Sequence, residues 1–151
     1  MASSSTPIPV RVLDPHVAAP AGLSIVEIPM SAVDRRRVRR LVEAPDGVVF
    51  ALELPTGTTL HPGQLLHHDS KTAYVVGAAD ENVLVVYPRD LVEAARIGHL
   101  IGNMHRDIHS SGNEIVALAD DVLADRLVRA SVPFERARRP FHGRASGDHS
   151  H

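Results

Sequence analysis

Short apolar runs alternate with turn residues along the first half of the chain, a pattern typical of β-strands. The runs are rich in β-branched residues, and the turns include Pro45-Asp46-Gly47, Pro55-Thr56-Gly57 and Pro62-Gly63. In such turns proline fixes φ and glycine supplies a positive φ. The pattern predicts an all-β domain over residues 23–78, with strands at Leu23–Ile28, Val38–Val42, Val48–Leu54, Gln64–His67 and Tyr74–Ala78.

The second half of the chain mixes strand-like runs with helical segments. After the apolar run Val83–Tyr87, Asp90–Ile101 is predicted to be a helix that stops at Gly102-Asn103. The apolar face expected for this helix consists of Leu91, Ala94, Ala95 and Gly98, which recur at helical spacing.

Two strands, a helix and a final strand are predicted to follow. A short segment at 106–109 and Glu114–Leu118 read as strands, and Asp120 or Asp121 can cap a second helix. The final strand is expected at Val132–Glu135. The order β-α-β-β-α-β is that of ferredoxin-like domains. The sequence therefore predicts an α+β protein in which an N-terminal all-β domain precedes a ferredoxin-like βαββαβ domain.

Composition shifts divide the chain into four segments. Residues 1–22, rich in Ala, Pro and Ser, are expected to form a loose leader. The β-rich domain over 23–78 and the ferredoxin-like domain over 79–141 follow, and residues 142–151 are expected to form a flexible, His-containing tail. Each domain is small, so pairing with a second copy of the chain would add to its stability.

Charge and cysteine content exclude several classes of protein. The 151 residues contain no Cys, which excludes a disulfide framework, Cys-based metal sites and thiol catalysis. A formal net charge of -2 argues against a nucleic-acid binder. No stretch approaches the roughly 20 apolar residues of a membrane helix, and no secretory signal is visible. We expect a cytoplasmic protein that binds neither nucleic acid nor a membrane.

Histidine is the candidate for metal chemistry, since neutral imidazole suits Ni²⁺, Zn²⁺ and Cu²⁺. Six of the ten His residues lie within the last 53 residues. His105 and His109, four apart, share one face of a helix or of a strand. The helix stop at Gly102-Asn103 favours the strand, in which Asp107 shares that face. The spacing fits equally well with surface histidines beside a turn.

The C-terminal histidines are a second candidate. His142, His149 and His151 lie in a tail that can close over a metal ion held elsewhere. On composition alone, a solvated tail with incidental histidines is the favoured interpretation.

A run of arginines follows Asp34. Arg35-Arg36-Arg37-Val38-Arg39-Arg40 can bind an acidic partner surface, or it can be an exposed strand protected by its charges. The acidic residues Glu43 and Asp46 follow at once, and the chain as a whole is slightly acidic, which favours the exposed strand.

Enzyme signatures are mostly absent. There is no His-Glu-x-x-His pair, no P-loop and no Gly-x-Ser-x-Gly elbow, so we do not expect an enzyme. Two alternatives to a metal carrier are kept: a protein-interaction module without metal, and a metal-dependent hydrolase. The hydrolase would need a carboxylate near His105, for which Asp107 is the candidate.

Gly102-Asn103-Met104-His105 resembles the Gly-Asn-x-His motif of the urease accessory protein E family of nickel metallochaperones. The resemblance extends over about residues 24–151, and its further motifs are Asp34-Arg35-Arg36-Arg37, Leu54-Pro55-x-Gly57, Leu60-x-x-Gly63, Asp121–Asp125 and Pro133-Phe134.

The resemblance implies a homodimer in which His105 from each chain shares one Ni²⁺. His149 or His151 would add ligands, with His109 and His142 as further candidates, and Zn²⁺ or Cu²⁺ can compete for the same site. The ion would pass to a GTPase accessory protein and on to apo-urease.

In this family the first domain is regarded as a peptide- or partner-binding module, which makes Arg35, Arg36 and Arg37 candidate partner contacts. The chain departs from the family pattern at Met104, where arginine is usual, and at Ala119-Asp120-Asp121, where some members carry histidines. The tail is also short, which argues against storage of many ions.

Overall fold

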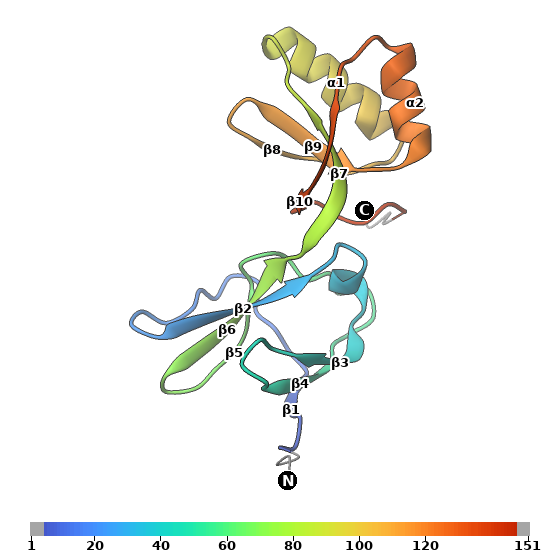
Figure 1. The fold of residues 1–151 in the computed structure, drawn as a ribbon. Helices are drawn as coiled ribbons and strands as arrows, with labels where there is room; N and C mark the ends of the chain where they lie inside the picture. Colours follow the sequence, from blue (N-terminus) through green and yellow to red (C-terminus); the bar gives the residue numbers. More distant parts are fainter. Residues whose placement is uncertain (1–4, 148–151) are drawn as a thin grey trace. The chain divides into compact units, whose positions relative to one another are not determined.

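The computed structural model describes residues 5–147 and shows an α+β protein. Ten strands in three sheets, two α-helices and one short 3-10 helix lie within these residues. The chain divides into two compact units between Ala78 and Ala79, each described by itself below (Figure 1). No helix within residues 5–147 is long and apolar enough to cross a membrane.

The first unit is built from two three-stranded sheets and one turn of 3-10 helix. One sheet has the order β1-β4-β3 and the other the order β2-β6-β5. In each sheet one pair is parallel, β1 with β4 and β2 with β6, and the other pair is antiparallel. The elements are β1 (Ile8–Val10), β2 (Ser24–Met30), η1 (Asp34–Arg36), β3 (Arg39–Glu43), β4 (Val49–Glu53), β5 (Leu65–His68) and β6 (Thr72–Ala78).

The core of the first unit lies between these strands. Alternate residues of β4 point inward, so that Phe50 and Leu52 are almost completely buried. The predicted turns are confirmed, since Gly47 and Gly57 each have a φ of 89°. Glycine adopts this left-handed conformation without the steric cost that a Cβ would impose.

Part of the segment expected to be a loose leader is structured. Ile8–Val10 form β1, which pairs in parallel with Phe50–Leu52 of β4, and Val10 is buried in the core. The expectation was wrong here because a three-residue strand is too short to show an alternating pattern. Its partner strand also lies about 40 positions further along the chain, beyond the reach of local pattern.

The second unit is a four-stranded antiparallel sheet with two helices on one side of it (Figure 1). Its strand order is β10-β7-β9-β8. The core contains Leu84 and Val86 of the sheet, together with apolar side chains from both helices. The elements are β7 (Asp80–Val86), α1 (Leu91–Asn103), β8 (His109–Ser111), β9 (Glu114–Leu118), α2 (Asp121–Arg129) and β10 (Glu135–Pro140).

An aspartate is the N-cap residue directly before each helix. The Asp90 carboxylate accepts a hydrogen bond from the Glu93 N–H at 2.7 Å, and Asp120 accepts one from the Leu123 N–H at 2.8 Å. Such side chains satisfy backbone donors that the first turn leaves without a partner.

The buried face of α1 differs from the predicted one. Ile97 and Ile101 are buried, whereas Leu91 is 85% exposed. The two isoleucines lie one turn apart and bury more apolar surface than the alanines and glycine that the prediction placed inward.

Two predicted strands in the second unit are displaced. The chain leaves α1 at Asn103 and β8 begins only at His109, so 106–108 are not part of a strand. The last strand begins at Glu135 and continues to Pro140, beyond the Val132–Glu135 segment that the sequence suggested. Arg-rich strands such as this one lack the apolar alternation on which the prediction depended.

Candidate metal-binding loop

The loop between α1 and β8 presents His105 directly after the helix. Met104 is the C-cap, and the His105 N–H donates to the Gly102 carbonyl at 2.9 Å. His105 has a φ of 56°, the left-handed conformation common just after a helix end, and it is exposed. For a residue other than glycine this conformation costs about 1–2 kcal/mol. The chain therefore places an imidazole where glycine would be accommodated more easily.

His105 and His109 do not share a face of a strand or a helix, which corrects the sequence-based expectation. His105 lies in the left-handed turn, whereas His109 is the first residue of β8. The regular i, i+4 geometry does not apply across a left-handed turn, because the chain changes direction there.

His109 contacts the chain segment that follows β10. Its Nδ1 accepts a hydrogen bond from the backbone N–H of His142 at 3.1 Å, and the two rings are 5.0 Å apart in an edge-to-face arrangement. Burial, and then the nearby His142, lower the pKa of His109, which favours the neutral ring. With Nδ1 as acceptor, the proton of the neutral ring is assigned to Nε2, so neither nitrogen offers a free lone pair in this arrangement.

Asp107 also contacts this segment. Its Oδ2 accepts a hydrogen bond from the Arg144 backbone N–H at 2.6 Å and lies 3.5 Å from the Arg144 Nε. The carboxylate that the hydrolase alternative required is therefore engaged with a main-chain donor and a guanidinium.

The remaining predicted ligands lie in or beyond the same segment. The His142 side chain is exposed, whereas His149 and His151 lie outside the described residues. Among residues 5–147 of one chain, no three His, Asp or Glu side chains are arranged to hold a metal ion together.

The arginine run is an exposed strand only in part: Arg39 and Arg40 begin the edge strand β3, as the sequence favoured, whereas Arg35–Arg37 precede it. Arg35 and Arg36 belong to η1, and the Arg35 guanidinium donates to the Met30 carbonyl at 2.7 Å with a side chain that is almost completely buried. Arg37 is exposed and lies 3.6 Å from the Asp34 carboxylate. Arg36 and Arg37 are the members of the predicted partner-binding set with accessible side chains.

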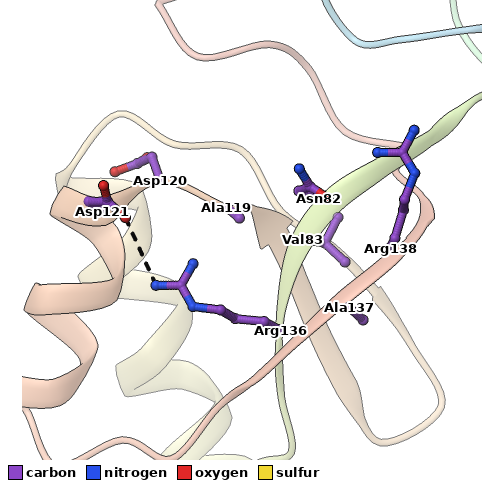
Figure 2. A pocket seen from close by; sticks show the side chains of 8 residues that line it. All are labelled: Asn82, Val83, Ala119, Asp120, Asp121, Arg136, Ala137 and Arg138. Atoms are coloured by element: carbon purple, nitrogen blue, oxygen red, sulfur yellow. Dashed lines mark ion pairs between the residues drawn. The ribbon is translucent and has the colours of Figure 1, made fainter.

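A charged groove lies beside the start of α2, and the sequence analysis did not predict it (Figure 2). Arg136 approaches Asp121 at 3.9 Å, and Asp120 pairs with Arg106 at 2.9 Å. The alternation of Arg136 and Arg138 along one face of β10 was the available signal. The groove has a volume of about 710 Å³ and is lined by Asn82, Val83, Ala119, Asp120, Asp121, Arg136, Ala137 and Arg138.

The fold and the loop define a two-unit α+β protein that presents an exposed imidazole from a helix-terminating turn. Comparison with known protein families identifies the family. Residues 10–79 match the N-terminal domain of the family described as UreE urease accessory protein, and residues 81–151 match its C-terminal domain. The chain belongs to this family.

Individual relatives agree with this assignment over most of the chain. The urease accessory protein UreE of Deinococcus radiodurans is 49% identical over 124 residues, which cover 82% of this chain and 80% of the relative. That of Synechococcus sp. (strain JA-3-3Ab) is 48% identical over 132 residues, or 87% of this chain and 89% of the relative. The UreE protein of Ralstonia nicotianae is 32% identical and covers 92% of this chain.

Proposed function

We propose that this protein is a nickel-binding metallochaperone that carries Ni²⁺ as cargo to apo-urease during assembly of its metallocentre. The observation that carries the proposal is the exposed His105 in a left-handed turn after α1, in a chain of the UreE urease accessory family. Ser131 has the same backbone conformation, so the imidazole at an exposed helix end in a chain of this family, and not the strain alone, supports a role for the His105 side chain.

The proposed site lies on the two-fold axis of a homodimer. A two-fold axis presents each residue twice, so one exposed His105 per chain becomes a pair of ligands. The first turn of α1, at the end of the helix opposite this loop, exposes Leu91 (85%) and Val92 (61%), an apolar surface that a second copy of the chain could cover. His149 and His151 are proposed to add ligands, and Zn²⁺ and Cu²⁺ are expected to compete with Ni²⁺ for nitrogen ligands.

The second unit is proposed to have the ferredoxin-like topology expected from the sequence. Its element order, β7-α1-β8-β9-α2-β10, and its fully antiparallel sheet of order β10-β7-β9-β8 support this assignment. In this unit the loop after the first helix lies between α1 and β8, and residues 141–147 follow β10, so regular elements flank both parts of the candidate site.

Transfer of the ion is proposed to involve a GTPase accessory protein and apo-urease, with the first unit as a partner-binding module. Arg36 and Arg37 are its candidate contacts, since both side chains are accessible. The protein is proposed to act in the cytoplasm and without catalytic activity. Asp107, on which the hydrolase alternative depended, is already bound to Arg144.

The proposal is tested by calorimetric titration of His105→Ala with Ni²⁺. We expect the tightest site to be lost, while His68→Ala, which removes an exposed imidazole from the first unit, leaves it unchanged. Binding to the parental protein should weaken below about pH 6, because imidazoles with a pKa of about 6.5 become protonated. Parental affinity in the His105→Ala protein would contradict the proposal.

A further inference from the structure

The sheet of the second unit has one long open edge. In the strand order β10-β7-β9-β8 the outermost strands are β8 and β10, which have three and six residues. Among residues 5–147 the backbone of β10 pairs with β7 alone, in antiparallel register from Glu135 opposite Val85 to Pro140 opposite Asp80. Because the backbone groups of a strand point alternately to its two sides, every second residue of β10 directs its backbone groups away from β7. An extended segment of another chain can form hydrogen bonds with such an edge.

Arginine side chains lie along one face of this edge. In the register with β7, Arg136 is opposite Leu84 and Arg138 is opposite Asn82. Opposite residues share a face of the sheet, and Leu84 packs in the core beneath the helices, so both arginines project on the face that carries the helices. Both side chains are exposed. A strand added beside β10 would therefore meet two positive charges at alternate positions of one face.

The charge of these arginines is only partly neutralised within the unit. In Figure 2 the Arg136 side chain extends toward Asp121, whereas that of Arg138 does not. Arg136 lies 3.9 Å from the Asp121 carboxylate, which is 99% exposed, so solvent weakens this attraction. The neighbouring Asp120 is already engaged by Arg106 at 2.9 Å. Within the described part of the chain, no ion pair includes Arg138.

The opposite face of β10 offers little charge to a partner. It carries Glu135, Ala137 and Arg139, which alternate with the two exposed arginines. Arg139 forms an ion pair with Glu114, and the Tyr87 hydroxyl lies 3.4 Å from the Glu135 carboxylate. A strand added at this edge would thus face positive charge on one side of the sheet and a small apolar residue on the other.

We propose that the free edge of β10 is a docking site for an extended acidic segment of a partner protein. The segment would add a strand to the sheet and place carboxylates, at alternate positions, against Arg136 and Arg138. Main-chain hydrogen bonds supply the attachment, and the spacing of the carboxylates supplies the selectivity. This surface is separate from the His105 loop, and the inference does not depend on nickel binding.

A second copy of β10 fits this edge poorly. Antiparallel pairing centred on Ala137 would set Arg136 of one copy opposite Arg138 of the other, and would do so twice. Like charges directly opposite each other destabilise a pair of strands. Charged side chains and proline, here Pro140 at the end of β10, are common protections of an edge against self-association. The charge pattern therefore selects an acidic partner over a second copy of the chain.

Amide hydrogen exchange in the full-length protein tests the docking. The probe is the peptide acetyl-Thr-Glu-Val-Glu-Val-Glu-Thr-amide, in which all glutamates share one face of an extended strand. In the protein alone, alternate amides of residues 135–139 should exchange freely, and the peptide at millimolar concentration should protect them. The same peptide with lysine in place of every glutamate should not. Failure of the glutamate peptide to protect these amides would overturn the proposal.

A peptide of the same composition without alternation separates strand addition from simple charge attraction. Acetyl-Glu-Glu-Glu-Thr-Val-Val-Thr-amide should protect the amides of β10 less than the alternating peptide does. Equal protection by the two peptides would overturn the proposed arrangement. Protection of all these amides in the absence of peptide would also overturn it, because the edge would then be occupied by a second copy of the chain.

Two double variants test the arginines. Arg136→Ala/Arg138→Ala should weaken binding of the alternating peptide about 2- to 30-fold, since each cross-strand charge pair changes affinity by about 1.4- to 5-fold. Arg126→Ala/Arg129→Ala removes two exposed arginines from the last turn of α2 and is the control, with the same change of net charge. It should leave the affinity unchanged. Equal losses in both double variants would show that net charge alone attracts the peptide, which would overturn the proposal.

Discussion

The two units of this protein place their histidines in different surroundings. In the first unit His67 lies beside the rings of Phe50 and Tyr74, with ring centroids 5.7 Å and 6.3 Å away. In the second unit His105 lies in a left-handed turn, and His109 contacts His142 where the chain after β10 reaches the loop between α1 and β8. His67 therefore packs against core rings, whereas His105 and His142 lie outside regular structure.

Polar groups show the same contrast. In the first unit, the hydroxyl of the buried Tyr74 in β6 donates to the Asp46 carboxylate at 2.8 Å, which joins one sheet to the turn between β3 and β4 of the other. In the second unit, Asp107 and His109 instead accept hydrogen bonds from the backbone N–H groups of Arg144 and His142, which follow β10. The first arrangement stabilises a core, whereas the second determines where a segment of chain lies.

The largest expected effect is the loss of a core ring from the first unit. Phe50 is completely buried and makes an edge contact with Tyr74 at 4.9 Å, so Phe50→Ala should lower the free energy of unfolding by about 3–5 kcal/mol. The chain contains two tyrosines, Tyr74 in the first unit and Tyr87 in the second. Urea unfolding can be followed for each unit separately by tyrosine fluorescence. Tyr74 reports on the first unit in a Tyr87→Phe protein, and Tyr87 reports on the second unit in a Tyr74→Phe protein.

If the two units are independent, Phe50→Ala shifts the unfolding transition seen by Tyr74 more than the one seen by Tyr87, and it leaves the affinity for Ni²⁺ unchanged. Leu127→Ala, in the core of the second unit, is the matched change and should shift the Tyr87 transition by about 2–5 kcal/mol. Equal shifts of both transitions in either variant would show that the units do not unfold separately.

A smaller effect is expected from the left-handed residues of the second unit. His105 and Ser131 have φ values of 56° and 57°, and each follows the C-cap of a helix. Substitution of either by glycine should raise the free energy of unfolding by about 1 kcal/mol, because glycine adopts this conformation without steric cost.

Nickel binding separates these two positions. Only His105→Gly should abolish the tight site, since Ser131→Gly relieves similar strain without removing an imidazole. Thermal unfolding and nickel titration of both variants provide the measurement. A loss of stability in His105→Gly would show that contacts of the His105 side chain outweigh the cost of its backbone conformation.

A further effect is confined to alkaline pH. Burial, and then the hydrogen bond and negative charge of Asp46, raise the pKa of Tyr74 to about 12. The folded protein then retains this proton between about pH 10 and 12 while the unfolded chain loses it, so stability falls as pH rises through this range. In a Tyr87→Phe background, phenolate absorbance should appear near pH 12, and Tyr74→Phe should remove the corresponding loss of stability. Phenolate formation near pH 10 in the folded state would contradict this account.

Features encoded by neighbouring residues could be predicted from the sequence. The Pro-x-Gly turns at 45–47 and 55–57 depend on residues within four positions, and the structure confirms them. A cap at Asp120 or Asp121 was also predicted, and Asp120 is the residue that caps α2. Strand β9 was predicted at Glu114–Leu118, where it lies, because its apolar run is bounded by turn residues.

Features that depend on distant partners could not be predicted. Strand β1 forms because Ile8 meets Phe50, and Asp107 meets Arg144 across 37 positions of sequence. The pattern of apolar and polar residues over a few neighbouring positions carries no information on such distant pairs. His105 was identified through its Gly-Asn-x-His motif, but its left-handed backbone was not expected, since that conformation usually selects glycine.

The proposed function depends on two chains that share one nickel ion through His105. Native mass spectrometry of the protein at limiting Ni²⁺ measures the number of chains and ions in one species. The account predicts a dimer with one tightly bound Ni²⁺ and, for His105→Ala, a protein without that ion. A tight ion in each single chain, or one ion per dimer in the His105→Ala protein, would contradict it.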